Sequence, residues 1–262
     1  MDLGIAGRRA IVAGASAGMG RASALALARE GVEIFLSARG EARLAAAAAE
    51  IAGETGAKVT PVVADHGTAQ GRAALLAACP APDILVITCA PPKAVSDFRD
   101  ITPEDWMASV ATTMIGPIEL MRATVDGMGE RGFGRVVNIA TIAAKNPAEA
   151  RLLSGPTRSA LTNYAVAVSK AMAKRGVIIN TILPGMYHTA TTAESFGALA
   201  VANGTSYDEE VAKVVKGLRI PARRFGDPED LGAWVAMFCS RQANYVVGQS
   251  LVIDGGLVNG LF

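Results

Sequence analysis

A glycine-rich turn at Gly14, Gly18 and Gly20 joins the apolar segment 10–13 to the alanine-rich segment 19–30. The first segment has the composition of a short buried strand, and the second has that of a helix. Such a turn presents backbone N–H groups and the positive end of a helix dipole, with no side chains to keep an anion at a distance. The motif therefore predicts a binding site for a nucleotide pyrophosphate, although on its own it also fits a merely tight strand-to-helix turn.

Strand-like and helix-like segments alternate along the rest of the chain. The continuous apolar run 84–88 is typical of a strand that is covered on both faces, as in a parallel sheet between two helix layers. Six further strands are expected at 10–13, 33–37, 58–64, 135–139, 177–183 and 250–253. Helices are expected around 19–30, 45–51, 72–78, 105–121, 161–174, 209–216 and 228–238. The alternation predicts an α/β fold, a Rossmann-like doubly wound parallel sheet of seven strands in a three-layer α/β/α arrangement.

The chain shows no linker, internal repeat or low-complexity tract, so we expect residues 1–262 to form a single nucleotide-binding domain. The segment 184–207 has no strand signal and contains Gly197 and Gly204. We interpret it as part of a lid insertion, at about 186–220, over the carboxyl ends of the strands, where ligands bind in such sheets.

Composition and charge exclude several classes of partner. The formal net charge is +1 with no basic block, so the chain lacks the clustered Lys and Arg that nucleic-acid binding needs. No apolar stretch is long enough to span a bilayer, so no membrane association is expected, and the 51% hydrophobic content indicates deep burial and subunit interfaces. The three cysteines and two histidines show no metal-ligand spacing, so no metal site is expected. The first residues carry no secretory signal, and a cytoplasmic location is expected.

The end of the second expected strand selects the cofactor in a dinucleotide-binding fold. An acidic residue there binds the ribose 2′-OH of NAD, whereas an arginine accommodates the 2′-phosphate of NADP. This chain has Ser37-Ala38-Arg39 and no acid at that point, so NADP(H) is expected in preference to NAD(H). At the end of the third strand, Asp65 is a candidate acceptor for the adenine amino group or, alternatively, a helix cap, and His66 is expected near the adenine.

Together with further motifs, these residues resemble the short-chain dehydrogenase/reductase family over essentially the whole chain. The motifs are Gly14–Gly20, Asp65, Gly134–Ile139, Asn180 through Pro184-Gly185, Arg224–Leu231, Gly248-Gln249 and Asp254-Gly255-Gly256. The resemblance implies a carbonyl–alcohol oxidoreductase similar to 3-oxoacyl reductases, with the nicotinamide bordered by Pro184, Gly185 and Thr189. The expected cofactor contacts are Gly14, Ser16, Gly18, Met19, Gly20, Arg39, Asp65, His66, Cys89, Ala90, Pro184, Gly185 and Thr189.

The expected catalytic positions depart from the family pattern. Members usually carry a Ser after the fifth strand, then a Tyr, then a Lys one helical turn beyond that Tyr. At the corresponding positions this chain has Thr141, Ser154 and Arg158, and a helical Asn of the family falls on Thr113. The loop that reads Asn-Asn-Ala-Gly in the family is here Thr88-Cys89-Ala90-Pro91.

These replacements change the chemistry available for proton transfer. A Tyr whose pKa is lowered by a Lys can shuttle a proton to a carbonyl oxygen, whereas a serine is much harder to ionise and an arginine stays protonated. Thr141 and Ser154 are expected to hold the substrate oxygen, and Arg158 to orient a ribose or a substrate carboxylate. Water or Tyr187 is expected to supply the proton, the alternative for Tyr187 being a wall of the nicotinamide pocket.

Three functions follow as alternatives. The first is an NADP(H)-dependent oxidoreductase that interconverts a small-molecule carbonyl and an alcohol through a non-standard site. The second is a cofactor-independent lyase resembling halohydrin dehalogenases, which carry Arg in place of Lys but keep the Tyr. The third is a non-catalytic NADP(H)-binding pseudoenzyme. The apolar helix 159–173 and, by family resemblance, the helix around 105–121 predict a homotetramer or homodimer, with the tail 257–262 adding a second interface.

Overall fold

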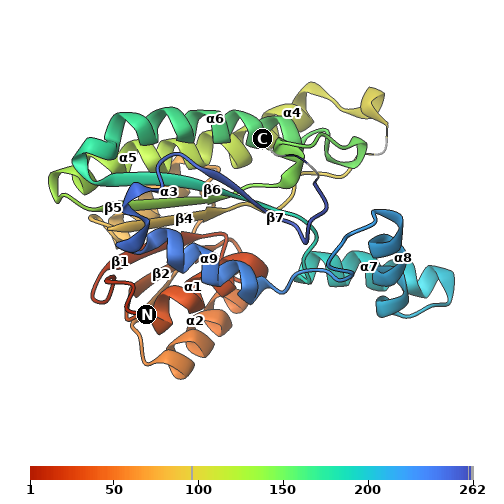
Figure 1. Ribbon diagram of the computed structural model, residues 1–262, viewed down its shortest axis with the longest axis horizontal. Helices are drawn as coiled ribbons and strands as arrows, with labels where there is room; N and C mark the ends of the chain where they lie inside the picture. Colours follow the sequence, from red (N-terminus) through yellow and green to blue (C-terminus); the bar gives the residue numbers. More distant parts are fainter. Residues whose placement is uncertain (96, 259, 261–262) are drawn as a thin grey trace.

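A computed structural model describes residues 1–95, 97–258 and 260, and within them the expected parallel sheet is present (Figure 1). Its strands are β1 (Arg9–Ala13), β2 (Glu33–Ala38), β3 (Val59–Val63), β4 (Ile84–Thr88), β5 (Gly134–Ile139), β6 (Val177–Pro184) and β7 (Ser250–Ile253). They pair in parallel in the order β3-β2-β1-β4-β5-β6-β7. The predicted Rossmann-like fold is confirmed, and its strand order reverses between β1 and β4, where ligands bind in such sheets.

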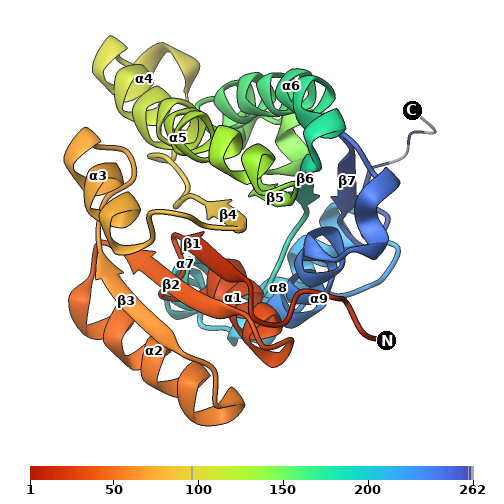
Figure 2. The same ribbon diagram turned by 90° about the vertical axis from the view of Figure 1, so that its left-hand side faces the viewer.

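Helices cover both faces of this sheet (Figures 1 and 2). One face carries α1 (Gly18–Arg29), α2 (Glu41–Thr55) and α9 (Pro228–Cys239). The other carries α3 (Ala69–Ala78), α4 (Pro103–Val110), α5 (Gly116–Glu130) and α6 (Ser154–Met172). Successive strand residues face opposite layers, so Val12 is buried in one core with Leu25 and Ile11 in another with Leu120.

The helix expected at 105–121 is divided into α4 and α5 by a π-helical turn at Ala111–Ile115. Gly116 packs against His66, where a Cβ would lie only 2.6 Å from the His66 carbonyl oxygen. Pro117 has no N–H to donate into the preceding turn, which helps to break the regular helical pattern. Turns of this kind are frequent at functional sites, and this one contains Thr113.

Two helices follow β6 and project beyond the carboxyl ends of the strands (Figure 1). They are α7 (Ala190–Asn203), which the sequence did not indicate as a helix, and α8 (Tyr207–Gly217), which it did. Val211 and Val215 of α8 form an apolar cluster with Ile220 and Phe225, which follow α8. The pair lies where the lid was expected, and its role as a lid stays a prediction.

In the part of the chain that the structure describes, no helix has both the length and the apolar character needed to cross a membrane. The same residues contain no group of three or more His, Cys, Asp or Glu side chains placed to hold a metal ion. Of the tail expected to add a second interface, Asn259, Leu261 and Phe262 lie outside the described residues.

Candidate active site

The predicted glycine turn lies where the strand order reverses, between β1 and β4. Gly14 has a φ of +74°, and a Cβ there would lie 2.1 Å from the carbonyl oxygen of Thr88, at the end of β4. A Cβ on Gly20 would lie 2.4 Å from the carbonyl oxygen of Gly14. Atoms do not approach so closely, so this turn can pack against β4 only with glycine at both positions.

The start of α1 offers unbonded N–H groups at the same place. Its N-cap residue, Ala17, has no side chain to bond them, and the first turn, which includes Met19, has no acidic residue. Ser16 precedes this turn, and Gly18 packs against Thr189, where a Cβ would lie 3.4 Å from the Thr189 Cβ. The structure thus brings the predicted pyrophosphate turn and a predicted nicotinamide contact together.

Arg39 directly follows β2 and is exposed. On the same side of the sheet, Arg21 pairs with Glu50 and Arg29 pairs with Glu54. Within residues 1–95, 97–258 and 260, the Arg39 guanidinium has no ion-pair partner. It therefore keeps its donors available for a phosphate.

Asp65 closes a local turn rather than capping α3. Its Oδ1 accepts from the N–H of Gly67 at 2.9 Å. The cap of α3 is Thr68, whose hydroxyl accepts from the N–H of Gly71 at 3.0 Å. The helix-cap alternative for Asp65 is therefore wrong, and its other carboxylate oxygen stays available for an adenine amino group.

His66 and Cys89 form a contact between the segments that follow β3 and β4. His66 Nε2 lies 3.3 Å from Cys89 Sγ and 3.2 Å from the carbonyl oxygen of Thr112. Burial lowers the pKa of His66 and raises the pKa of Cys89 to about 11, so neither carries a charge at neutral pH. Their side chains link the sheet to the π-helical turn. Their carbonyl oxygens are engaged too, since that of His66 accepts from Arg72 Nη1 at 2.9 Å and that of Cys89 accepts from Arg158 Nη2 at 3.0 Å.

Ser154 and Arg158 form one buried unit at the start of α6. Arg158 is 5% exposed, and its Nη1 donates to Ser154 Oγ. Its Nη2 donates to the carbonyl oxygens of Cys89 at 3.0 Å and of Ala90 at 3.5 Å. Burial lowers the pKa of Arg158, and no carboxylate pairs with it among the described residues. Because Ser154 Oγ accepts from Arg158, the Ser154 hydroxyl can still donate a hydrogen bond to a substrate oxygen.

A buried cluster of hydroxyl groups supports this unit, and most of it was missed by sequence reasoning. Thr113 Oγ1 lies 2.6 Å from Thr157 Oγ1. The Thr157 and Ser109 hydroxyls both donate to the carbonyl oxygen of Leu153, at 2.9 and 3.0 Å. Thr113, at the position of the family's Asn, therefore positions the first turn of α6. The available signal was the spacing of Ser109 and Thr113, which places both hydroxyls on one helix face.

Thr141 follows β5 and is half-buried. Its Oγ1 accepts from the N–H of Ala143 at 3.3 Å. The turn that follows packs on α6, since a Cβ on Gly155 would lie 2.9 Å from the carbonyl oxygen of Ala143. The structure thus brings the segments that carry Thr141 and Ser154 together.

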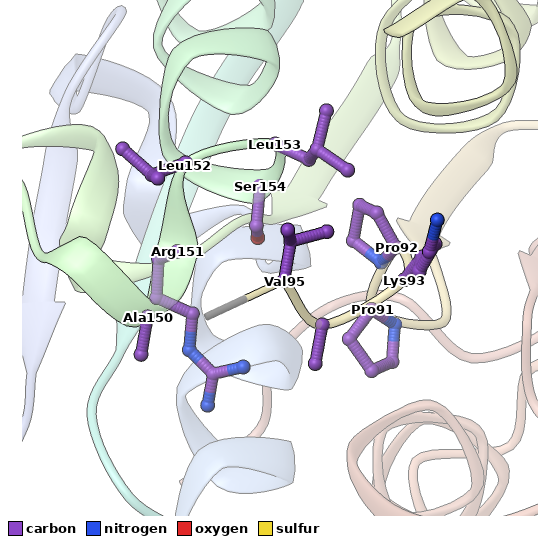
Figure 3. A pocket seen from close by; sticks show the side chains of 10 residues that line it. Pro91, Pro92, Lys93, Val95, Ala150, Arg151, Leu152, Leu153 and Ser154 are labelled. Atoms are coloured by element: carbon purple, nitrogen blue, oxygen red, sulfur yellow. The ribbon is translucent and has the colours of Figure 1, made fainter. Parts of the chain in front are cut away.

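A narrow cleft opens beside Ser154 (Figure 3). The Ser154 hydroxyl points into the space between the loop after β4 and the segment before α6. The lining residues are Pro91, Pro92, Lys93, Ala94, Val95, Ala150, Arg151, Leu152, Leu153 and Ser154. Two of these side chains, Lys93 and Arg151, are cationic.

The remaining predicted residues follow β6. Pro184 ends the strand, and the N–H of Gly185 donates to the carbonyl oxygen of Ile253 at 3.0 Å. A Cβ on Gly185 would lie 2.7 Å from the Cβ of Asp254, so glycine allows this close approach to β7. Thr189 is the N-cap of α7 and accepts from the N–H of Thr192 at 3.2 Å.

Tyr187 is buried in the same region. Its hydroxyl donates to the carbonyl oxygen of Ile253 at 3.2 Å, and a Cβ on Gly226 would lie 2.7 Å from its ring. Burial, with smaller contributions from Asp230 and Asp254, raises the pKa of Tyr187 to about 12. A phenol held in this way is poorly placed to give a proton to a substrate, so these observations favour a packing role.

Comparison with known proteins agrees with this geometry. The family model described as "Enoyl-(Acyl carrier protein) reductase" matches residues 14–258. The human dehydrogenase/reductase SDR family member 4 is 30% identical over 256 residues, covering 96% of this chain and 88% of that protein. The 3-oxoacyl-[acyl-carrier-protein] reductase of Vibrio harveyi is 25% identical over 256 residues, covering 97% of this chain and 99% of that protein.

A solved structure extends the likeness to three dimensions. L-Sorbose reductase from Gluconobacter frateurii, complexed with NADPH and L-sorbose, superposes on this chain with a TM-score of 0.95. The two chains are 29% identical, and the match covers 100% of each. The fold is therefore shared over the full length of both chains.

Proposed function

The chain belongs to the short-chain dehydrogenase/reductase family, and on this premise we propose that it is an NADP(H)-dependent oxidoreductase that interconverts a carbonyl and an alcohol. The observation that carries the proposal is that the glycine turn and Arg158 both contact the end of β4. Gly14 packs on the carbonyl oxygen of Thr88, and Arg158 donates to that of the next residue, Cys89. The nucleotide turn and the Ser154–Arg158 unit are thereby held side by side.

The residues present fit NADP(H). The open start of α1 would hold the pyrophosphate, and the unpaired Arg39 would bind the 2′-phosphate. Pro184, Gly185 and Thr189 would border the nicotinamide, which supplies or accepts a hydride when the cofactor is bound. The L-sorbose reductase with the same fold was complexed with NADPH, which supports this choice.

The chain's own groups would hold the oxygen of the substrate. The Ser154 hydroxyl can donate a hydrogen bond to that oxygen, and the charged donor from Arg158 polarises the hydroxyl, which makes it a stronger hydrogen-bond donor. Thr141 would be the second donor. Neither hydroxyl ionises readily, so the proton that completes the alcohol comes from water in the cleft. Tyr187 is the alternative proton donor, and Tyr187→Phe would abolish turnover if it had that role.

Substitution of Ser154 tests the proposal. NADPH oxidation is followed at its absorbance band against a panel of ketones, first with the unaltered protein. For a substrate found in this way, Ser154→Ala should lower turnover by about 10²-fold, as for loss of one preorganised donor. Ser250→Ala is the matched control, because Ser250 is exposed at the amino end of β7, away from the site. The assignment fails if Ser154→Ala and Thr141→Ala both leave turnover unchanged.

A pseudoenzyme is the second candidate, and the Tyr187 hydroxyl favours it, because that phenol is bonded to the carbonyl oxygen of Ile253. In that case the protein would bind NADPH and turn over none of the panel. The lyase alternative has less support, because those enzymes fill the nucleotide pocket, whereas here the turn is built with glycine.

We further propose a homotetramer, with a homodimer as the alternative, in the cytoplasm. Apolar side chains on α4 and the π-helical turn support an interface: Trp106 is 36%, Met107 69% and Ile115 40% exposed. Light scattering at micromolar concentration tests the assembly, and a monomer there would contradict it.

A further inference from the structure

The cleft beside Ser154 carries a positive charge that nothing in the described chain neutralises. Of its two cationic lining residues, Lys93 is engaged, with its Nζ 3.0 Å from Asp105 Oδ2. Arg151 is exposed and forms no ion pair within residues 1–95, 97–258 and 260. None of the lining residues is acidic. Arg151 therefore presents an uncompensated guanidinium to the cleft.

Arg158 bonds the cleft residue Ser154 but does not itself line the cleft. It is 5% exposed, and its guanidinium also donates to the carbonyl oxygens of Cys89 and Ala90. Burial, with a smaller contribution from Arg151, lowers the pKa of Arg158. Arg151 is therefore the guanidinium that an anion in the cleft would meet, and such an anion would compensate its charge.

The surroundings preserve this charge. Glu149 shares the short helical turn with Arg151 but makes no ion pair with it in the described chain, and Lys145 adds a further cation to the same segment. In Figure 3 the Arg151 side chain and the loop bearing Pro91 lie on opposite sides of the space into which the Ser154 hydroxyl points.

We propose that this cleft binds the carboxylate of the substrate through Arg151, so that the substrates are oxo acids and the corresponding hydroxy acids. The inference rests on the proposed oxidoreductase function and narrows its substrate class. The carboxylate lies against the Arg151 guanidinium while Ser154 and Thr141 hold the keto oxygen. The planar fork of an arginine matches the two oxygens of a carboxylate, and a neutral ester offers no charge for that contact.

Calorimetry on the NADPH-loaded protein tests the inference with 2-oxobutanoate and 4-oxopentanoate, each against its methyl ester. At least one acid should bind about tenfold or more tightly than its ester, as expected for a charge-assisted contact. Arg151→Gln should bring the acid-to-ester affinity ratio close to one. Arg151→Lys, which keeps the positive charge, should retain part of the preference for the acid. Arg151 is exposed, so these variants leave the core intact.

Lys174→Gln is the matched control, because it removes one exposed positive charge just beyond the far end of α6 and should leave the ratio unchanged. The inference is overturned if neither acid binds more tightly than its ester, or if Arg151→Gln leaves the preference intact.

The two proposals fail separately. Reduction of the esters without any preference for the acids would leave the oxidoreductase function standing and remove the carboxylate site. Acid binding that depends on Arg151, together with no NADPH oxidation by any ketone, would leave the anion site standing and remove the oxidoreductase function.

Discussion

The glycine turn and the start of α6 meet at the end of β4 but are built in different ways. The turn depends on backbone geometry, because Gly14 has positive φ and no room for a Cβ beside Thr88. The start of α6 depends on side chains, because Arg158 reaches the carbonyl oxygen of Cys89 and bonds Ser154. A backbone-built element tolerates almost no substitution, whereas a side-chain-built one can change its chemistry while the fold stays the same. The half that is predicted to bind the nucleotide is therefore recognisable in the sequence, whereas the half built from side chains is not.

The largest expected effect is on the rate of ketone reduction, when Ser154 and Arg158 are both replaced. Ser154→Tyr with Arg158→Lys supplies an ionisable hydroxyl and a nearby amine, so ketone reduction should rise by about 10²- to 10⁴-fold, the usual range for general acid–base catalysis. Steady-state NADPH oxidation measures the change. Ser154→Phe with Arg158→Lys is the control, with the same ring and no hydroxyl, and equal rates for the two variants would contradict the prediction.

A single added atom, the Cβ of an alanine in place of Gly14, should disrupt the glycine turn. Gly14→Ala places a Cβ 2.1 Å from the carbonyl oxygen of Thr88. Left-handed backbone alone costs an ordinary residue about 1–2 kcal/mol, and the clash adds to it, so NADPH affinity should fall by about 100-fold or more. Calorimetry measures the affinity, and thermal unfolding shows whether the fold also suffers.

Gly53→Ala is the matched control for that variant. Gly53 lies inside α2 with nothing within 4 Å of its would-be Cβ, so the substitution should stabilise the protein slightly and leave NADPH binding unchanged. Similar losses of affinity in both variants would show that the turn is not the nucleotide site.

Arg39 is the one side chain on which cofactor choice is expected to depend. Its contact with the 2′-phosphate should contribute about 1.5–3 kcal/mol, so NADPH should bind at least tenfold more tightly than NADH. Arg39→Ala should erase that difference while leaving NADH affinity nearly unchanged. Equal affinities for the two cofactors in the unaltered protein would refute the assignment.

The smallest expected effect is the pH dependence of local stability in the α7–α8 pair. Glu210 is buried, accepts from Lys213, Thr205 and Asn203, and has its pKa lowered to about 2, chiefly by Lys213. A carboxylate with a depressed pKa stabilises the folded state above its unfolded pKa, near 4.5, and this contribution is lost as the pH falls toward about 2.

Hydrogen exchange of the α8 amides, corrected for the intrinsic rate, should therefore accelerate between about pH 4.5 and 2. Glu210→Gln has no charge to lose and should remove this acceleration. A pH dependence that is the same in both proteins would show that Glu210 does not hold the two helices together.

Local patterns in the sequence were enough for much of the architecture. The apolar run of β4 and the alternation of strands with helices predicted the parallel sheet, because the order of apolar and polar residues along a short segment reflects which of its faces are buried. The glycines of the turn and the arginine after β2 were likewise identified from their positions alone. Each of these features can be recognised from the residue types of a short stretch of chain.

Other features depended on residues far apart in the chain, and only the tertiary structure decided them. The contact between Arg158 and Cys89 spans 69 residues, and that between Tyr187 and Ile253 spans 66. The first makes Ser154 and Arg158 a buried unit beside the cofactor turn, and the second withdraws the predicted phenol into the core. The sequence by itself determined which elements form and which residue types they carry. Which side chains meet was decided by packing, because the partner of each polar group depends on how the whole chain folds around it.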